Sequence, residues 1–403
     1  MSHVHENVNT VVSMNAQPFS QRALVQMLAE QLRKLLGGIL WLPTVKLECN
    51  SREARLQIDI VARFQIRGGP EIEFLVECKN EPRPSQFPIV VNRFPYVAIE
   101  REFEKEKGTT KLVRVPVFAA PYISPRMAEI CESHHWSWFD LAGNCRISVP
   151  GLLHLEHRGN PPVHHRLRPV ANLSSPEAGR VIRALLQPAN AMTRWTQREV
   201  ERHFGELALP IPEPSLGLIN KVVRHLRDEA FIEDAPNGGF RLIDPMKLLF
   251  AWRDAYRFDR HERRGYFALL QGRDLRDALA RLSSQAGGHA VYATFSAAEI
   301  QAPHVRQPKT WMYIREKDVP RLERLVEAKP VESGENMVVL IPDDEGIFYI
   351  SDGGVMGDPR MPCTNAVQTF VDLWHSGGGG KEAAEALLEQ RLKPEWKFRG
   401  MKV

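Results

Sequence analysis

The chain has 403 residues, a hydrophobic fraction of 43%, a charged fraction of 25% and a formal net charge of +4. This length predicts two or three domains, and this composition excludes a disordered chain, a collagen-like repeat and a coiled-coil rod. No apolar run approaches the roughly 20 residues that span a bilayer, and the polar N-terminus lacks a signal-peptide pattern, so we expect no membrane association. The five cysteines are scattered and odd in number, which predicts reduced thiols and a cytoplasmic protein.

The charge is uneven along the chain. Residues 163–264 contain 17 Lys and Arg against 13 Asp and Glu, whereas the remaining residues balance. A local basic excess is typical of proteins with an acidic partner such as DNA, although an excess of four charges also lies within ordinary scatter. Charge alone therefore does not decide the function.

The first third of the chain shows alternating helix and strand signals. Apolar spacing and turn residues predict a helix at 18–36, strands at 44–49, 56–65 and 71–79, a buried strand at 113–119 and a helix at 124–134. This order of elements is typical of an α/β domain.

Charged residues share one face of the strand predicted at 71–79. Side chains alternate along a strand, so Glu77 and Lys79 project together. In the preceding strand, Asp59 lies between two isoleucines and points away from both. A Gly-rich turn of odd length would place Asp59 opposite Glu77 or Lys79. Two carboxylates and one ammonium group would then converge at the end of a sheet.

This set of side chains favours metal-assisted hydrolysis of a phosphodiester, because carboxylate oxygens hold Mg²⁺ and a lysine stabilises the developing charge. The pattern resembles the PD-(D/E)XK nuclease superfamily. That resemblance implies metal ligands at Asp59 and Glu77, a catalytic Lys79, a further ligand in the Cys78 carbonyl and an accessory role for Gln86. The alternative interpretation is a solvated charged edge strand.

The middle of the chain has the pattern of a winged helix-turn-helix. A helix at 174–185 begins with serine and proline, and Thr196 and Glu199 have the spacing of a capping box at the start of a second helix. A third helix follows at 215–230, and residues 231–242 predict a two-stranded wing with a glycine turn. The insertion at 206–214 lengthens the turn before the third helix.

The third helix is apolar on one face and basic on the other. It carries three basic residues and no acidic residue between 215 and 227. A recognition helix of this kind enters the major groove of duplex DNA, although many winged helices bind only proteins. The residues that we expect to contact DNA are Thr196, Arg198, Ser215, Asn220, Lys221, Arg224, Arg227 and, in the wing, Asn237.

Several segments outside these motifs are distinctive: 122–127, 138–144, 292–298, 371–374 and 380–388. With the order of the domains, they resemble AbiEi-family antitoxins of type IV toxin–antitoxin systems, in a long form with an extra N-terminal domain. The resemblance implies a winged helix that represses its operon at operator DNA and a C-terminal domain with antitoxin activity. The implied protein partner is a nucleotidyltransferase-like toxin.

Other acidic and metal-ligand patterns are weak. The acidic run at 343–345 precedes a glycine and predicts a solvated turn. The histidines and cysteines between 131 and 157 lack the paired spacing of a zinc site.

These observations predict a multidomain α/β protein. Its expected parts are a restriction-endonuclease-like α/β domain at 1–160, a winged helix-turn-helix at 161–262 and a C-terminal α/β domain at 263–403. The expected function is a DNA-binding transcriptional regulator of antitoxin type. The first alternative is a Mg²⁺-dependent PD-(D/E)XK nuclease in phage or plasmid defence, and the second is an interaction protein with a nuclease-like scaffold.

Overall fold

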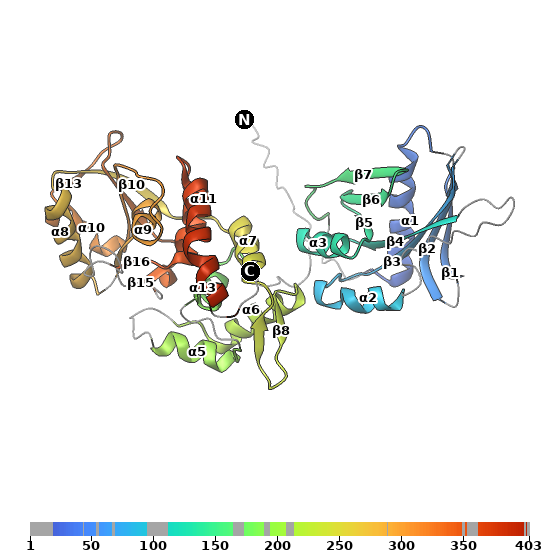
Figure 1. The fold of residues 1–403 in the computed structure, drawn as a ribbon, viewed down its shortest axis with the longest axis horizontal. Helices are drawn as coiled ribbons and strands as arrows, with labels where there is room; N and C mark the ends of the chain where they lie inside the picture. Colours follow the sequence, from blue (N-terminus) through green and yellow to red (C-terminus); the bar gives the residue numbers. More distant parts are fainter. Residues whose placement is uncertain are drawn as a thin grey trace, which may run out of the picture. The chain divides into compact units, whose positions relative to one another are not determined.

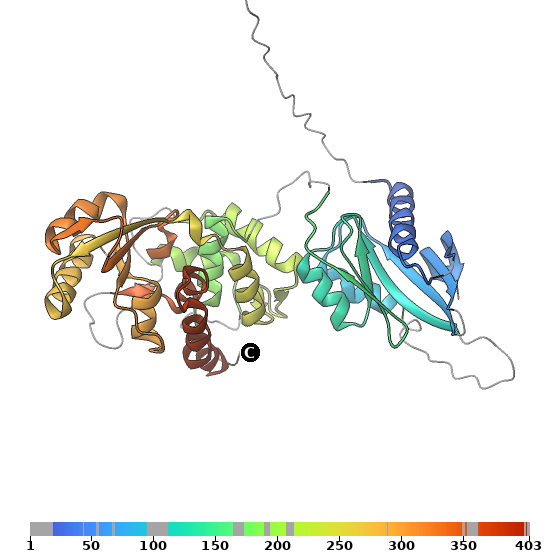
Figure 2. The same cartoon turned by 90° about the horizontal axis from the view of Figure 1, so that it is seen from above.

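The computed structural model describes residues 19–42, 44–53, 56–66, 69–94, 112–163, 173–188, 194–206, 213–287, 289–348, 351–352, 362–398 and 400. The chain divides into two compact units, Met1–Pro169 and Val170–Val403. Both are α/β, and each contains one mixed seven-stranded sheet (Figures 1 and 2). The second unit contains both the region expected as a winged helix and the region expected as a separate C-terminal domain.

The first unit follows the predicted order of elements and adds several that the sequence did not indicate. Its elements are α1 (Gln21–Gly37), β1 (Lys46–Glu53), β2 (Leu56–Gln65), β3 (Glu71–Cys78), η1 (Pro84–Gln86), α2 (Phe87–Arg93), β4 (Leu112–Ala120), α3 (Pro125–Ser133), β5 (Ser137–Asp140), β6 (Cys145–Val149) and β7 (Leu153–His157). The predicted helices and strands up to α3 are confirmed within a few residues, whereas α2 was not predicted.

The sheet of the first unit keeps the strands in sequence order, β1 to β7. The strands β1, β2 and β3 are antiparallel, β3, β4 and β5 are parallel, and β6 and β7 return antiparallel. Leucines of α1, such as Leu28, pack with Ile60 and Val76 on one face of the sheet. Phe87 of α2 and Met127 of α3 pack on the other face. Helices therefore cover both faces, as burial of a parallel centre requires.

The second unit begins with three helices and a hairpin. They are α4 (Pro176–Leu186), α5 (Gln197–Glu206), α6 (Leu216–Asp228), β8 (Ile232–Asp234), β9 (Phe240–Leu242) and α7 (Pro245–Ala255). The predicted helices and the hairpin are confirmed within a few residues. The insertion predicted at 206–214 lies largely outside the described residues.

The rest of the second unit is a sheet flanked by helices. Its elements are η3 (Phe258–Arg260), β10 (Glu262–Ala268), α8 (Gly272–Gln285), β11 (Ala290–Tyr292), α9 (Thr294–Gln301), β12 (Thr310–Ile314), η4 (Glu316–Asp318), α10 (Val319–Leu325), β13 (Ala328–Pro330), β14 (Met337–Ile341), η5 (Glu345–Phe348), β15 (Ser351–Asp352), β16 (Cys363–Thr364), α11 (Ala366–Ser376), α12 (Gly380–Leu387), η6 (Leu388–Leu392) and α13 (Lys393–Phe398). The strand order is β13-β10-β14-β12-β11-β16-β15.

One apolar core joins the helices of the second unit to its sheet. Val181 of α4, Trp252 of α7, Leu340 of β14 and Phe370 of α11 belong to the same buried cluster. The indole N–H of Trp396 in α13 donates to the carbonyl oxygen of Leu186 at 2.9 Å. The boundary predicted at 262 therefore falls within a continuous core.

None of the helices in the described part of the chain has the length and hydrophobicity to cross a membrane.

Candidate nucleic-acid interface

A reciprocal capping box begins α5. The backbone N–H of Thr196 donates to Oε2 of Glu199 at 2.6 Å, and the N–H of Glu199 donates to Oγ1 of Thr196 at 3.2 Å. Hydrogen bonds from Thr196 hold the pKa of Glu199 below its usual range. The predicted capping box is confirmed, and the Thr196 hydroxyl serves the helix start.

The helix α6 begins with its own cap and buries one face. Oγ of Ser215 accepts the N–H of Leu218 at 3.3 Å. The buried residues of α6 are Ile219, Val222, Val223 and Leu226, at the 3–4 residue spacing of an amphipathic helix. The opposite face exposes Lys221 and Arg224.

Polar contacts fix the position of α6 relative to α5. Nδ2 of Asn220 donates to Oε1 of Gln197 at 3.1 Å, and one guanidinium nitrogen of Arg224 donates to Oδ1 of Asn220 at 3.1 Å. This chain of hydrogen bonds holds the Arg224 side chain beside the start of α5. A side chain held in place loses less conformational entropy when it binds a ligand.

The hairpin β8–β9 is extended by a third short segment. Trp195 pairs with Phe240, and their backbone groups exchange two hydrogen bonds of 2.7 Å. Gly238 and Gly239 form the turn with φ of +80° and +79°. A Cβ atom at Gly239 would collide with the carbonyl oxygen of Trp195, so this position requires glycine.

One charged pair joins α6 to the hairpin, and a second joins the two strands of the hairpin. The guanidinium of Arg227 contacts Oδ1 of Asp234 in β8 at 2.8 and 3.1 Å. Arg241 of β9 donates to Glu233 of β8 at 2.5 Å. Arg227, which the sequence placed among the DNA-contacting residues, therefore already has a carboxylate partner within the protein.

Three cations of this surface have no such partner. Within the described residues, no carboxylate forms an ion pair with Arg198, Lys221 or Arg224, and all three side chains are exposed. Exposed cations on a helix face can neutralise phosphates of a nucleic acid. Asn237 is also exposed at the tip of the wing. The structure thus brings the predicted residues of α6 and the wing into one folded subregion.

Sequence reasoning missed Arg194 and Gln197. The guanidinium of Arg194 donates to the carbonyl oxygens of Asn237 and Gly238 at 3.1 and 3.3 Å, so it stabilises the turn of the hairpin. The position of Arg194 next to Trp195 was the available signal for this role. It could not be used, because Trp195 pairs with Phe240, which is distant in the sequence. Gln197 was missed because only the fold brings it to Asn220.

The residues of the nuclease-like pattern are placed differently. Nζ of Lys79 lies 2.7 Å from Oε1 of Glu77, so these two residues meet as predicted. Arg93 of α2 contacts the same oxygen at 3.1 Å, and the Glu77 residue is only 2% exposed. Asp59 instead accepts the backbone N–H of Cys78 on Oδ2 at 2.8 Å.

The predicted alternation around Asp59 is wrong. Ile58 and Ile60 were expected on the same face, but Ile58 packs with Leu75 and Phe87, whereas Ile60 packs on the α1 face. The paired register of β2 and β3 begins only at Ile60 and Val76. The regular alternation of β2 is therefore interrupted at Asp59. The Cys78 N–H donates to the Asp59 side chain instead of to a backbone carbonyl of β2.

These contacts give Asp59 and Glu77 separate hydrogen-bond partners. In the described residues, no group of three or more His, Cys, Asp or Glu side chains is placed to hold a metal. Nε2 of Gln21 in α1 lies 3.5 Å from Oδ1 of Asp59 and donates to the Cys78 carbonyl at 3.2 Å, so Asp59 and the third predicted ligand share one hydrogen-bond partner. Gln86 lies in η1 and has an exposed side chain. The three predicted donors lie at the C-terminal end of β3, where Asp59 binds the Cys78 backbone and Glu77 binds Lys79 and Arg93.

No protein-family model, curated protein or solved structure matches this chain.

Proposed function

We propose that the chain binds duplex DNA through α6 and the β8–β9 wing. The observation that carries this proposal is the pair of exposed cations, Lys221 and Arg224, on the face of α6 opposite its buried stripe. The order of α4, α5, α6 and the hairpin supports the interpretation as a winged helix-turn-helix. In this motif the recognition helix lies in the major groove, where Arg and Lys contact guanine edges or phosphates.

The biological role in this proposal is repression of the protein's own operon as an antitoxin-type regulator. The likeness of the chain to AbiEi antitoxins supports this role, and a nucleotidyltransferase-like toxin is the proposed protein partner. The exposed wing tip at Asn237 and its support by Arg194 favour a contact with the DNA backbone beside the groove.

Footprinting on the duplex upstream of the protein's own gene tests the regulatory role. We expect protection of a short site, and we expect Lys221→Ala combined with Arg224→Ala to remove that protection. Arg273→Ala is the matched control, because Arg273 is an arginine of α8 whose side chain is 86% exposed. Equal protection by all three proteins would remove α6 from the interface.

A metal-dependent nuclease is the second proposed function. The order of α1, the antiparallel strands β1 to β3 and the parallel strand β4 agrees with the order expected from the resemblance to PD-(D/E)XK nucleases, and this agreement favours the proposal. The contact between Lys79 and Glu77 also agrees with it. The separate contacts of Asp59 argue against it, so the DNA-binding regulator is the first choice.

Incubation of DNA with Mg²⁺ or Mn²⁺ tests the nuclease. Cleavage that stops with EDTA and with Lys79→Ala would support it, because the lysine would act on the transition state. Glu129→Ala in α3 is the control, because the Glu129 side chain is 62% exposed and pairs with Arg126. Absence of cleavage on single-stranded and duplex DNA would exclude this activity for those substrates.

A further inference from the structure

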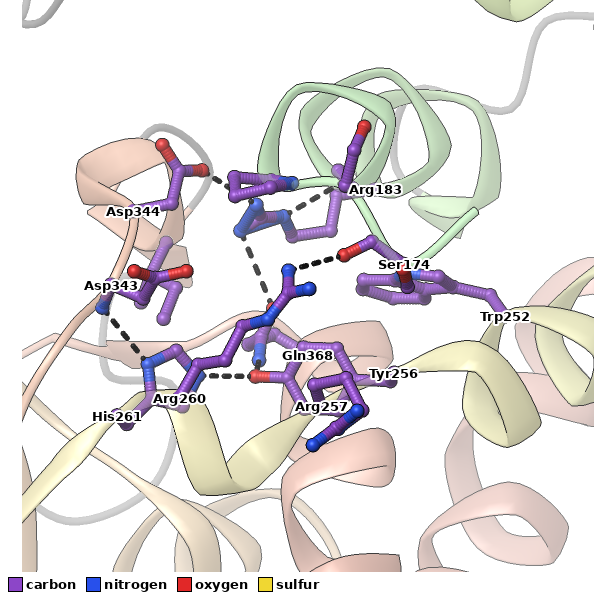
Figure 3. A pocket seen from close by; sticks show the side chains of 14 residues that line it. Ser174, Arg183, Trp252, Tyr256, Arg257, Arg260, His261, Asp343, Asp344 and Gln368 are labelled. Atoms are coloured by element: carbon purple, nitrogen blue, oxygen red, sulfur yellow. Dashed lines mark hydrogen bonds and ion pairs between the residues drawn. The ribbon is translucent and has the colours of Figure 1, made fainter. Parts of the chain in front are cut away.

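A pocket lies in the second unit between the start of α4, the segment after α7, the segment at 343–347 and α11. Its lining includes Ser174, Arg183, Arg260, His261 and Asp343 (Figure 3). Arg183 enters the pocket from α4, and Arg260 enters it from η3. The lining contains no residue of α6 or of the β8–β9 hairpin, so neither proposed function rests on this pocket.

Arg183 forms part of the buried wall. Its side chain is 5% exposed, and its Nε donates to the Gly179 carbonyl at 3.1 Å. The closest carboxylate oxygen belongs to Asp344, at 3.4 Å. Arg180 holds the same carboxylate through Nε at 2.9 and 3.1 Å. One carboxylate therefore serves two guanidinium groups, and burial lowers the pKa of Arg183.

This arrangement corrects the expectation of a solvated turn at 343–345. The Asp344 side chain is only 9% exposed, because the ion pairs with α4 draw it into the core. Asp343 remains exposed, and its backbone N–H donates to Nδ1 of His261 at 3.1 Å. Burial lowers the pKa of His261 to about 4, so the His261 side chain is neutral near pH 7 and Asp343 carries the negative charge of this wall.

Arg260 supplies a second cation at the rim. One terminal nitrogen donates to the Ser174 carbonyl oxygen at 2.9 Å, which directs the guanidinium over the start of α4. Among the described residues, Arg260 forms no ion pair, since the adjacent Asp259 binds Arg257 at 2.7 and 2.9 Å. A guanidinium has five N–H donors, so Arg260 retains donors for a ligand.

The lining residues contain three guanidinium groups and two carboxylates, which leaves one excess positive charge. Ser175 and Pro176 of the lining lie at the start of α4, and the positive end of the helix dipole adds partial positive charge to the same wall. We propose that this pocket binds a phosphoryl oxyanion, with Arg260 contacting its oxygens and Arg183 compensating its charge from below. Arg is the residue best suited to such contacts, because its planar fork matches phosphate oxygens.

The position of the pocket gives the ligand a structural consequence. Arg183 and Ser174 belong to the winged-helix part of the unit, whereas Asp343 and Gln368 belong to the part around the sheet. A bound oxyanion would contact both parts and would stabilise their junction. The source of the oxyanion is either a small phosphorylated molecule or a phosphate of the DNA backbone.

Calorimetric titration with inorganic phosphate at constant ionic strength tests the proposal. We expect saturable binding at millimolar phosphate. Arg260→Ala should weaken it about tenfold, the effect of losing a charge-assisted hydrogen bond. Asp343→Asn should tighten binding several-fold, because it removes a like charge from the wall. Arg273→Ala on α8 is the control and should leave binding unchanged.

Competition with duplex DNA identifies the source. If phosphate still binds to protein saturated with duplex, the ligand is a small phosphorylated molecule, and if duplex displaces phosphate, the ligand is a backbone phosphate. Absence of a saturable response to phosphate would overturn the proposal. Equal affinity of Arg260→Ala and Arg273→Ala, with both proteins folded by circular dichroism, would also overturn it.

Discussion

Arg224 and Arg227 lie one helical turn apart on α6 and have different partners. Both residues were expected to contact DNA, because both follow the polar face of α6. Arg227 forms two hydrogen bonds with Asp234 and holds the hairpin against α6, whereas among the described residues Arg224 donates to the neutral amide of Asn220 and forms no ion pair. A charge that is already paired contributes less to phosphate binding, since the ligand must compete with the internal carboxylate.

A buried polar chain in the second unit determines the expected pH dependence. Oδ1 of Asp372 accepts the Tyr256 hydroxyl at 2.8 Å and the Gln368 amide at 2.7 Å, and Oδ2 accepts the Tyr313 hydroxyl at 3.1 Å. Nε2 of His261 donates to the Tyr256 oxygen at 2.7 Å, because its Nδ1 accepts from Asp343. Both oxygens of the Asp372 carboxylate therefore accept a hydrogen bond.

Asp372 and His261 act in opposite directions on stability. Burial raises the pKa of Asp372 from 3.8 to about 7, so the folded protein keeps a proton there that the unfolded chain releases. The contribution of this group to stability therefore falls as pH rises from about 4 to about 7. Burial lowers the pKa of His261 from 6.5 to about 4, so the unfolded chain binds a proton there that the folded protein does not. The contribution of His261 to stability therefore rises as pH rises from about 4 to 6.5.

We predict that Asp372→Asn changes the slope of stability against pH. The variant retains the contribution of His261, which rises with pH, and loses the contribution of Asp372, which falls with pH. The slopes of unfolding free energy against pH in the variant and in the wild type should differ by up to about 1.4 kcal/mol per pH unit. Urea unfolding of the full chain at several pH values between 5 and 7 measures it. A pH dependence identical to that of the wild type would show that Asp372 titrates outside this range.

At the scale of elements, the stability of the β8–β9 hairpin depends more on Gly239 than on Gly238. We predict that Gly239→Ala lowers the free energy of unfolding by about 1–3 kcal/mol, because it combines a positive φ with a collision against Trp195. Gly238→Ala has a similar φ but open space around its Cβ, so it should cost only about 1 kcal/mol.

Thermal unfolding compares the two variants, and DNA affinity at low temperature reports the wing. Gly239→Ala should also weaken DNA binding, because displacement of β9 would move the tip. Equal stability of both variants would contradict the close approach of the wing to Trp195.

The sequence predicted the elements with strong local signals and missed those that depend on distant partners. The caps at Thr196 and Ser215 and the stripe of α6 have fixed spacings within the chain, so they were predictable. The helix α2 was missed because its seven residues are short and follow a proline-rich run. The break in alternation between Ile58 and Ile60 was not predictable, since two different cores bury the two side chains.

The same distinction holds for the candidate sites. The basic face of α6 follows from helical periodicity and was identified in advance. The pairing of Arg227 with Asp234 and the support of the wing by Arg194 need the hairpin register. The ion pairs of Asp344 connect residues about 160 positions apart, and no local pattern marks them.

At the scale of the whole molecule, the shared core couples the helices α4 to α7 and the β8–β9 hairpin to the sheet of the second unit. Phe370 of α11 is fully buried in the cluster that contains Val222 of α6. We predict that Phe370→Ala lowers the free energy of unfolding of the second unit by about 3–5 kcal/mol. It should lower the temperature at which DNA binding is lost, although Phe370 belongs to no DNA-contacting element.

Phe74→Ala is the matched control, because Phe74 is fully buried in the core of the first unit. Calorimetry combined with DNA binding at increasing temperature measures both variants. Loss of DNA binding at the same temperature in the wild type and in Phe370→Ala would contradict a continuous core across the predicted boundary at 262.

The salt dependence of DNA binding tests the central claim most directly. For duplex from the protein's own upstream region, the logarithm of affinity should fall linearly with the logarithm of salt concentration. The combined variant Lys221→Ala and Arg224→Ala should reduce this slope by about one unit for each lost phosphate contact, whereas Arg273→Ala should leave it unchanged. An unchanged slope and affinity in the combined variant would contradict DNA binding through α6.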